Sequence, residues 1–268
     1  MKARAAAVGL ILLSAALMPG QGAAAPEQAQ RAARWKDLHT TVFGARPLMG
    51  TSRLILLEAP DRALDAAFVP ITLTMPEADK VAAVHLFVDD NPSPYAAHFT
   101  FGPAADPAQI KFKVRVDSYT DIHAVVETKD GKLYQTSKFI KAAGGCSAPL
   151  GVTEAEARKG MGEMKLKLPG DIRSSAPVEA TLTIRHPNFN GMQMDQMTKG
   201  YTPARFIREV DVSSGGQAVF KLKADISLSS DPVITFRFRP QAAPVVVSAV
   251  DSQNGRWRQS FETAPVKR

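Results

Sequence analysis

Short apolar runs alternate with turn-forming residues along most of the chain, and this pattern predicts β-strands. The stretch Ile110-Lys-Phe-Lys-Val-Arg-Val alternates apolar and polar residues, which is typical of a strand with one face in water. Similar runs in the first half of the chain predict six strands, over residues 69–75, 81–88, 98–101, 110–116, 122–127 and 133–140. Lys129-Asp130-Gly131-Lys132 is expected to form a hairpin turn between the last two.

The second half of the chain repeats this pattern after an interruption. Pro149 and Gly151 end the first series, and Thr153-Glu-Ala-Glu-Ala-Arg-Lys is expected to form a short capped helix or a linker. Seven further runs predict strands over residues 163–168, 178–184, 206–212, 218–226, 233–238, 245–250 and 257–262. Asn254-Gly255 is a strong hairpin signal between the last two.

Together these elements predict an all-β protein. Strands at intervals of about 8–12 residues, separated by turn signals, are typical of immunoglobulin-like sandwiches. We therefore expect two immunoglobulin-like β-sandwich domains in tandem, over residues 35–146 and 161–268, joined by a linker over residues 147–160. The pattern predicts no long helix, because no sustained helical periodicity is evident.

The first residues have the features of a secretory signal peptide. Met1-Lys-Ala-Arg is basic, residues 5–18 are apolar, and Gly22-Ala23-Ala24 supplies the small residues of a cleavage site. The apolar run is shorter than the roughly 20 residues that span a bilayer. We expect residues 1–24 to be removed and the mature chain to be a soluble periplasmic protein without a membrane partner.

Composition and charge narrow the function only slightly. Apolar residues make up 45% of the 268 positions, which is enough for a real core. The formal net charge is +7, spread along the chain without a basic stripe, so we expect no nucleic-acid partner. A modest positive field favours anionic small molecules or an acidic partner protein.

The single cysteine, Cys146, is the strongest candidate for chemistry. Exported proteins usually pair their cysteines, so one alone indicates a reactive thiol or an intermolecular disulfide, such as one linking a homodimer. Gly144 and Gly145 precede it and are expected to form a flexible arm. The alternative is a small buried apolar residue, but the polar, loop-like flanking sequence favours an exposed thiol.

Two lysines near the cysteine are candidates for supporting a thiolate. Lys138 and Lys141 would lower the pKa of the Cys146 thiol and attract a sulfur oxyanion such as thiosulfate. The alternative is that both are solvated residues at a strand edge. The absence of a second cysteine argues against a thiol oxidoreductase.

A methionine-rich stretch offers a different function. Met192, Met194 and Met197 lie within six residues, and thioether sulfurs suit Cu(I). A periplasmic copper-binding or metallochaperone module is therefore the alternative function. Methionines also fill gaps at adaptable interfaces, which is the other interpretation of this stretch.

Other kinds of site find no support in the sequence. The five histidines are scattered without zinc-ligand spacing, and neither a Gly-x-Ser-x-Gly elbow nor a phosphate-binding glycine loop is present. We therefore expect no metal, no cofactor and no independent enzyme active site.

Motifs in both halves resemble one known family. Val84-His-Leu-Phe-Val-Asp-Asp-Asn-Pro-Ser-Pro, Ala97-His-Phe-Thr-Phe-Gly-Pro, Gly131-Lys-Leu-Tyr and Gly144-Gly-Cys resemble the sulfur carrier protein SoxY. Ile184-Arg-His-Pro, Tyr201-Thr-Pro-Ala-Arg-Phe-Ile-Arg-Glu-Val and Asp231-Pro-Val-Ile-Thr-Phe-Arg-Phe resemble its partner SoxZ. With both on one chain, over residues 35–146 and 160–265, the sequence resembles the fused SoxYZ-like carriers associated with quinoprotein dehydrogenases.

The resemblance implies a carrier and not an enzyme. Cys146 would hold sulfur-oxidation intermediates covalently, Gly144 and Gly145 would form the flexible approach, and no further cofactor would be needed. The partners would be periplasmic sulfur-oxidising or quinoprotein-associated redox enzymes, and the second domain would pack on the first. The sequence departs from SoxY after Cys146, where Ser147-Ala-Pro continues into the second domain, so the arm is tethered at both ends unless the chain is cut there.

Overall fold

The structure is a computed structural model that describes residues 24–50, 53–149, 151–169, 176–195, 199–241 and 243–263. Apart from Ala24, which begins a helix, the expected signal peptide lies outside the described residues. Below, the first half denotes the chain up to Cys146 and the second half the chain from Ser147. In the described part of the chain, no helix is both long and apolar enough to cross a membrane.

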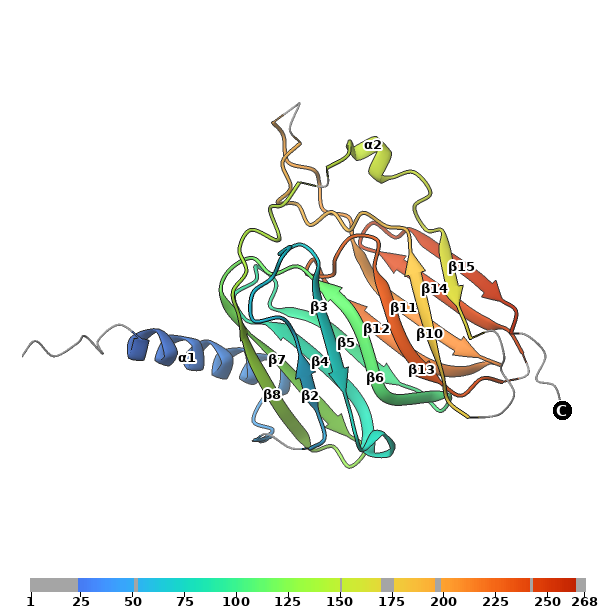
Figure 1. Cartoon of the computed structure of the whole chain (residues 1–268), viewed down its shortest axis with the longest axis horizontal. Helices are drawn as coiled ribbons and strands as arrows, with labels where there is room; N and C mark the ends of the chain where they lie inside the picture. Colours follow the sequence, from blue (N-terminus) through green and yellow to red (C-terminus); the bar gives the residue numbers. More distant parts are fainter. Residues whose placement is uncertain are drawn as a thin grey trace, which may run out of the picture.

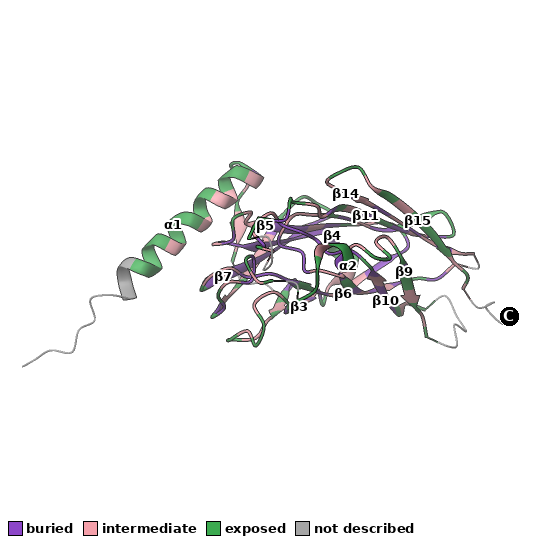
Figure 2. Ribbon diagram, turned by 90° about the horizontal axis from the view of Figure 1, so that it is seen from above, coloured by how far each residue is buried: buried purple, intermediate pink, exposed green. Residues whose placement is uncertain are grey.

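Two β-sheets lie face to face and form a sandwich (Figures 1 and 2). The strands of the first half are β1 (Leu48–Met49), β2 (Leu56–Glu58), β3 (Val69–Thr74), β4 (Val81–Val88), β5 (Tyr95–Phe101), β6 (Ala105–Val114), β7 (Thr120–Thr128) and β8 (Leu133–Ile140). Those of the second half are β9 (Met164–Lys167), β10 (Val178–Ile184), β11 (Ile207–Ser214), β12 (Gln217–Ala224), β13 (Val233–Phe238), β14 (Val245–Asp251) and β15 (Arg256–Phe261). The expected all-β sandwich fold is confirmed.

Both sheets run through both halves of the molecule. The nine-stranded sheet has the order β1-β8-β7-β4-β5-β12-β11-β14-β15, and the six-stranded sheet has the order β2-β3-β6-β13-β10-β9. The halves join where β5 pairs with β12 and β6 pairs with β13, both antiparallel. Pairing these edges satisfies backbone groups that each half alone would leave open. The halves therefore form two shared sheets, which the strand pattern by itself does not reveal.

An aromatic core crosses this junction. The Phe99 ring lies 5.2 Å from Phe112 in the first half and 5.6 Å from Phe220 in the second, centroid to centroid. Phe220 in turn meets the edge of Phe236 at 5.0 Å. All four side chains are at most 3% exposed, and they belong to one hydrophobic core that spans both halves. Figure 2 shows the buried residues along the strands of both layers.

Most strand and turn predictions are confirmed by the structure. The predicted bounds of β10 and β13 coincide with the observed ones. Along β6, Ile110, Phe112 and Val114 are buried while the lysines between them are not, as the alternation predicts. Both hairpin turns form, and each contains a residue with positive φ: Gly131 at 79° and Asn254 at 64°.

The helix α1 (Ala24–Phe43) was not predicted. It lies against the outer face of the nine-stranded sheet near β7 and β8, and its N-terminal part extends away from the body (Figure 1). Trp35 anchors it: the indole stacks on His123 with ring centroids 3.8 Å apart and donates a hydrogen bond to Gln135 Oε1 at 2.8 Å. Arg31 adds an ion pair with Asp121 at 3.0 Å.

Between α1 and the sheet lies a set of packed rings that we call the aromatic–histidine cluster: Trp35, Phe43, His85, Phe87 and His123. The cluster explains why β4 is buried on both faces. One face meets the sandwich core, and the other meets the helix. A strand covered on both sides reads as a continuous apolar run and not as an alternation, as residues 81–88 do.

The segment after Cys146 contains the short helix expected from its capping residues. Helix α2 (Glu154–Ala157) begins after Thr153, whose side chain accepts from the Glu156 N–H. The Glu156 carboxylate accepts from the Thr153 N–H in return, which completes a capping box. A single 3₁₀ turn, η1 (Ala78–Lys80), precedes β4.

Candidate functional site

Cys146 lies outside the strands, in a stretch that leads from β8 toward the second half. We call this stretch, residues 141–149, the cysteine segment. It starts beside the β2–β3 connection, where the Lys141 N–H donates to Asp61 O at 2.9 Å and Ala63 N–H donates to Lys141 O at 3.0 Å. The segment, α2 and the loop between β10 and β11 gather at one end of the sandwich (Figure 1).

The two glycines hold the cysteine segment against the sandwich. The backbone N–H groups of Gly144 and Gly145 donate to Asp117 O at 2.7 Å and to Val116 O at 3.1 Å. Gly144 has a φ of 74°, in the left-handed region that favours glycine, and a Cβ on Gly145 would lie 2.1 Å from Ala66 O. In this structure the glycines are therefore fixed, contrary to the flexible arm expected from the sequence, because they permit close backbone packing.

Cys146 is fully buried and held from both halves of the molecule. Its backbone N–H donates to Asp117 Oδ1 at 3.2 Å, just beyond the end of β6 in the first half. Its backbone carbonyl accepts from Asn190 Nδ2 at 2.6 Å, from the loop between β10 and β11 in the second half. The expectation of an exposed thiol is wrong for this conformation, because the two side chains that enclose the cysteine are distant in sequence.

Burial sets the protonation state of the thiol. Loss of solvation is the main cause that raises the pKa of Cys146 to about 12, and the neighbouring Asp117 carboxylate contributes because a second negative charge is disfavoured there. The Arg115 guanidinium acts in the opposite direction and is outweighed. In this buried position, which we call the docked state, Cys146 is therefore a neutral thiol at physiological pH. A neutral thiol is a poor nucleophile.

The two lysines expected near the thiol have other partners. Lys138 Nζ forms an ion pair with Asp61 Oδ1 at 2.9 Å. Lys141 is exposed, and its backbone pairs with the β2–β3 connection. Neither lysine contributes to the pKa shift of Cys146, so the predicted thiolate support is not found. The interpretation of these lysines as strand-edge residues fits better, because Lys138 is paired with Asp61 and Lys141 is exposed just after β8.

The cation that does act on Cys146 is buried. Arg115 is 1% exposed, and its guanidinium donates to the backbone carbonyls of Leu228, Ile226 and Pro187 at 2.5, 3.2 and 3.4 Å. Burial lowers the pKa of Arg115 to about 10, so it remains charged at neutral pH. The alternation of residues 110–116 predicts a solvated position for it. Instead, the second half covers the end of β6.

A buried polar network fixes the loop that carries Asn190. The His186 ring accepts from the Asn188 N–H at 3.1 Å, and its Nε2 lies 3.6 Å from Asp251 Oδ2. Arg205 donates to the same carboxylate oxygen at 2.6 Å. Two of the SoxZ-like motifs, around His186 and Arg205, therefore build the base of this loop.

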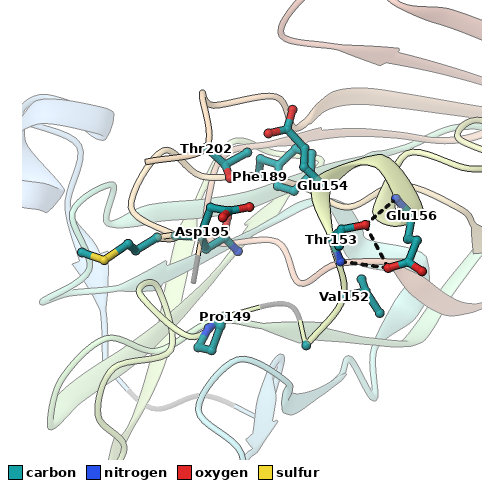
Figure 3. A pocket seen from close by; sticks show the side chains of 11 residues that line it. Pro149, Val152, Thr153, Glu154, Glu156, Phe189, Asp195 and Thr202 are labelled. Carbon is teal, nitrogen blue, oxygen red and sulfur yellow. Dashed lines mark hydrogen bonds between the residues drawn. The ribbon is translucent and has the colours of Figure 1, made fainter. Parts of the chain in front are cut away.

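A pocket of about 370 Å³ opens beside the cysteine segment (Figure 3). One side consists of the segment's end and the α2 region, and the other of the β10–β11 loop. The lining residues are Pro149, Gly151, Val152, Thr153, Glu154, Glu156, Phe189, Gln193, Met194, Asp195 and Thr202. Three of these side chains are carboxylates, and one of them, Glu154, forms an ion pair with Arg158.

Nothing in the structure tests copper binding by the methionine stretch, so this alternative function stays a prediction. Met192 is half-buried and Met194 is 37% exposed, whereas Met197 lies outside the described residues. Among the described residues, no group of three or more His, Cys, Asp or Glu side chains is placed to hold a metal ion. That finding does not concern thioether ligands.

Sequence reasoning missed the three residues that surround the cysteine: Arg115, Asp117 and Asn190. Asp117 directly follows a predicted strand, where a turn residue is ordinary. Asn190 lies in the methionine stretch, and an amide among turn residues carries no distinctive signal. Each acquires its role only when the two halves pack together.

Comparisons with known proteins address both halves. A family model described as "Sulfur oxidation protein SoxY" matches residues 39–146, and one described as "Sulphur oxidation protein SoxZ" matches residues 166–262. A search of curated proteins found no match.

Among solved structures, the sulfur carrier protein SoxY from Chlorobium limicola f thiosulfatophilum is 27% identical, with a TM-score of 0.39, over 44% of this chain and 100% of that one. A beta-glycosidase from Bacteroides vulgatus is 10% identical, with a TM-score of 0.22, over 84% of this chain and 26% of that one. The two family matches together cover most of the sequence, and the first ends at Cys146. The chain therefore belongs to the SoxY and SoxZ families, whose domains it carries in tandem.

Proposed function

We propose that this protein holds a sulfur-containing group covalently on Cys146 and presents it to partner oxidoreductases. Its family membership makes it a sulfur-oxidation carrier and not an enzyme. The observation that carries the proposal is the position of its one cysteine, at the end of the SoxY domain and between side chains of both domains.

The docked conformation is the resting state of the carrier. A buried neutral thiol with a pKa of about 12 reacts slowly at physiological pH, so loading requires the cysteine segment to leave its place. Six residues, 141–146, separate the end of β8 from the thiol. Extended, they reach about 20 Å. The tethered segment can therefore expose Cys146 without a cut in the chain.

Loading has a defined redox balance. Joining the Cys146 thiol to thiosulfate forms one S–S bond, releases one proton and removes two electrons. The chain has a single cysteine, so no internal disulfide can take up these electrons. A partner redox protein must accept them, which is why the proposed partners are sulfur-oxidising or quinoprotein-associated enzymes.

The proposed compartment is the periplasm, reached through the signal peptide expected in residues 1–24. An oxidising compartment keeps S–S adducts of an exposed thiol from being reduced. A disulfide-linked homodimer through Cys146 requires the cysteine segment to open in two copies at once, and it stays a prediction.

Loading can be tested on the purified mature protein. Incubation with thiosulfate and a mild electron acceptor is expected to add one thiosulfate-derived group, detected by intact-mass spectrometry. The group is expected to be absent in Cys146→Ser and to be lost on reduction. An adduct that forms only on the unfolded protein would instead assign Cys146 a structural role.

A further inference from the structure

We propose that Asn190 is the positioning residue that keeps the cysteine segment docked, so that the SoxZ domain controls access to the thiol of the SoxY domain. This inference rests on the proposed function. It assigns a division of labour between the halves: the first carries the thiol, and the second holds it in place.

The hydrogen bonds of the cysteine segment are likewise divided between the two halves. Gly144 and Gly145 donate to the backbone of residues 116–117, and the Cys146 N–H donates to Asp117, all within the first half. Across the junction, Asn190 Nδ2 donates to the Cys146 carbonyl at 2.6 Å. The Asn190 contact therefore ties the segment to the second half at the cysteine itself.

The orientation of the Asn190 amide is fixed by its other contacts. The Met192 N–H donates to Asn190 Oδ1 at 2.9 Å, which requires an acceptor at that position. The Nδ2 group must then face the Cys146 carbonyl as a donor. Asn190 is 5% exposed, so breaking this bond strands a buried donor and acceptor unless the segment moves out.

The loop that carries Asn190 is anchored within the second half by side-chain and backbone bonds, whereas the cysteine segment is held mainly through its backbone and outside the strands. Asn188 Nδ2 donates to Ser229 O at 2.7 Å, and Asn188 Oδ1 accepts from the Ile207 N–H at 2.9 Å. The Arg205 N–H donates to Phe189 O at 2.8 Å across the same loop. The cysteine segment lies outside the strands. When the contact breaks, the segment is therefore the part that moves.

Release of this contact changes the chemistry of the thiol. In the docked state Cys146 is buried, and the Asp117 carboxylate next to its backbone disfavours a thiolate. Movement away from the sandwich removes both effects at once. A partner that displaces the contact at Asn190 thereby exposes the thiol and makes it a better nucleophile.

The test compares two isosteric variants in the same loop. Asn190→Asp keeps the acceptor for the Met192 N–H but sets a carboxylate oxygen against the Cys146 carbonyl. Asn188→Asp makes the same change at a buried asparagine that bonds Ser229 O and does not touch the cysteine segment. In native buffer, Asn190→Asp is expected to raise the alkylation rate of Cys146 roughly tenfold or more, and Asn188→Asp is expected to raise it far less.

Measuring the alkylation rate at several pH values separates a positioning role of Asn190 from a general loosening of its loop by the substitution. The buried carboxyl that Asn190→Asp introduces becomes protonated as the pH falls, and the protonated form can again donate a hydrogen bond to the Cys146 carbonyl. With a pyridyl disulfide reagent, the ratio of the Asn190→Asp rate to the rate of the unaltered protein is therefore expected to decrease toward one on acidification. Equal rates in both variants, or a ratio that does not change with pH, would overturn the proposal.

These outcomes are independent of cargo. A protein that shows the expected alkylation rates but never acquires a sulfur group loses the proposed function and keeps the positioning role of Asn190. A protein that is loaded normally, but whose alkylation is unaffected by Asn190→Asp, keeps its function and loses that role.

Discussion

The cysteine segment and the aromatic–histidine cluster both bury a titratable side chain in its neutral form, but they hold it by different means. In the cluster, burial lowers the pKa of His85 to about 3, and the ring packs edge-on against Phe43 with centroids 4.9 Å apart. At the cysteine, burial raises the pKa of the thiol to about 12, and hydrogen bonds hold the backbone.

This difference separates a permanent site from a releasable one. The rings of the cluster pack on strands β4 and β7 and on helix α1, so they loosen only if the helix or the sheet does. The cysteine segment lies outside the strands and depends on a few hydrogen bonds, each worth about 1 kcal/mol net. Local opening with an intact sandwich is therefore available to the cysteine segment and not to the cluster.

The largest expected effect is the loss of stability that acid causes in the aromatic–histidine cluster. The pKa of His85 is lowered chiefly by burial, then by His98 and Arg46, so the unfolded chain binds the proton more readily. The contribution of His85 to stability is complete above the ordinary pKa of 6.5 and is lost as the pH falls from there toward 3. Between about pH 7 and about pH 4, the free energy of unfolding should fall by about 3 kcal/mol from this group.

Denaturant titrations at both pH values measure this loss, and His85→Leu serves as the matched variant. The leucine keeps an apolar side chain under α1 and cannot bind a proton, so its acid-induced loss should be smaller by that amount. Identical losses in both proteins would show that His85 is not buried in the neutral form.

A side chain at Gly145 should open the cysteine segment without unfolding the sandwich. The Cβ of Gly145→Ala would meet Ala66 O and Val116 O at 2.1 and 2.5 Å, so the segment must move. Overpacking of this kind costs about 1–3 kcal/mol, which corresponds to about 5- to 150-fold faster alkylation of Cys146.

Gly50→Ala is the control, since its Cβ meets nothing within 4 Å. Alkylation that remains slow in Gly145→Ala would mean that the segment is not held by close backbone packing. Alkylation that becomes fast only at denaturant concentrations where the whole sandwich unfolds would mean that the segment does not open independently.

The smallest expected effect concerns the charge beside the cysteine. Asp117→Asn keeps an oxygen to accept from the Cys146 N–H and removes the negative charge that raises the thiol pKa. The pKa of Cys146 should fall but stay above its ordinary value, because burial is the larger cause. Thiolate absorbance during a pH titration, corrected with Cys146→Ser, measures this shift, and an unchanged titration would contradict the assigned role of Asp117.

Strands were predictable because their signals are local. The alternation of residues 110–116 and the glycine and asparagine turns lie within a few residues of the elements they define. Helix α1 also had a local signal, since Trp35, Leu38, Val42 and Phe43 follow helical spacing, and the continuous apolar run of β4 indicated a strand covered on both faces. The strand over residues 81–88 was predicted, but the helix and the burial of that strand on both faces were not.

The environment of the cysteine was not predictable in this way. Lys138, Lys141 and Ser147 are near Cys146 in sequence and suggested an exposed basic site. Asp117 and Asn190, which hold it, lie 29 and 44 residues away and come from different halves. Their convergence depends on the pairing of β5 with β12 and of β6 with β13, and edge pairing has no distinct sequence pattern.

The most direct test of the carrier function is intact-mass spectrometry of the mature protein isolated from its own cells without reductant, alongside Cys146→Ser. A sulfur-containing adduct that is removed by reduction and absent from the variant is the predicted result. A thiol that remains unmodified in the cell and in the purified protein with thiosulfate and an electron acceptor would contradict the account.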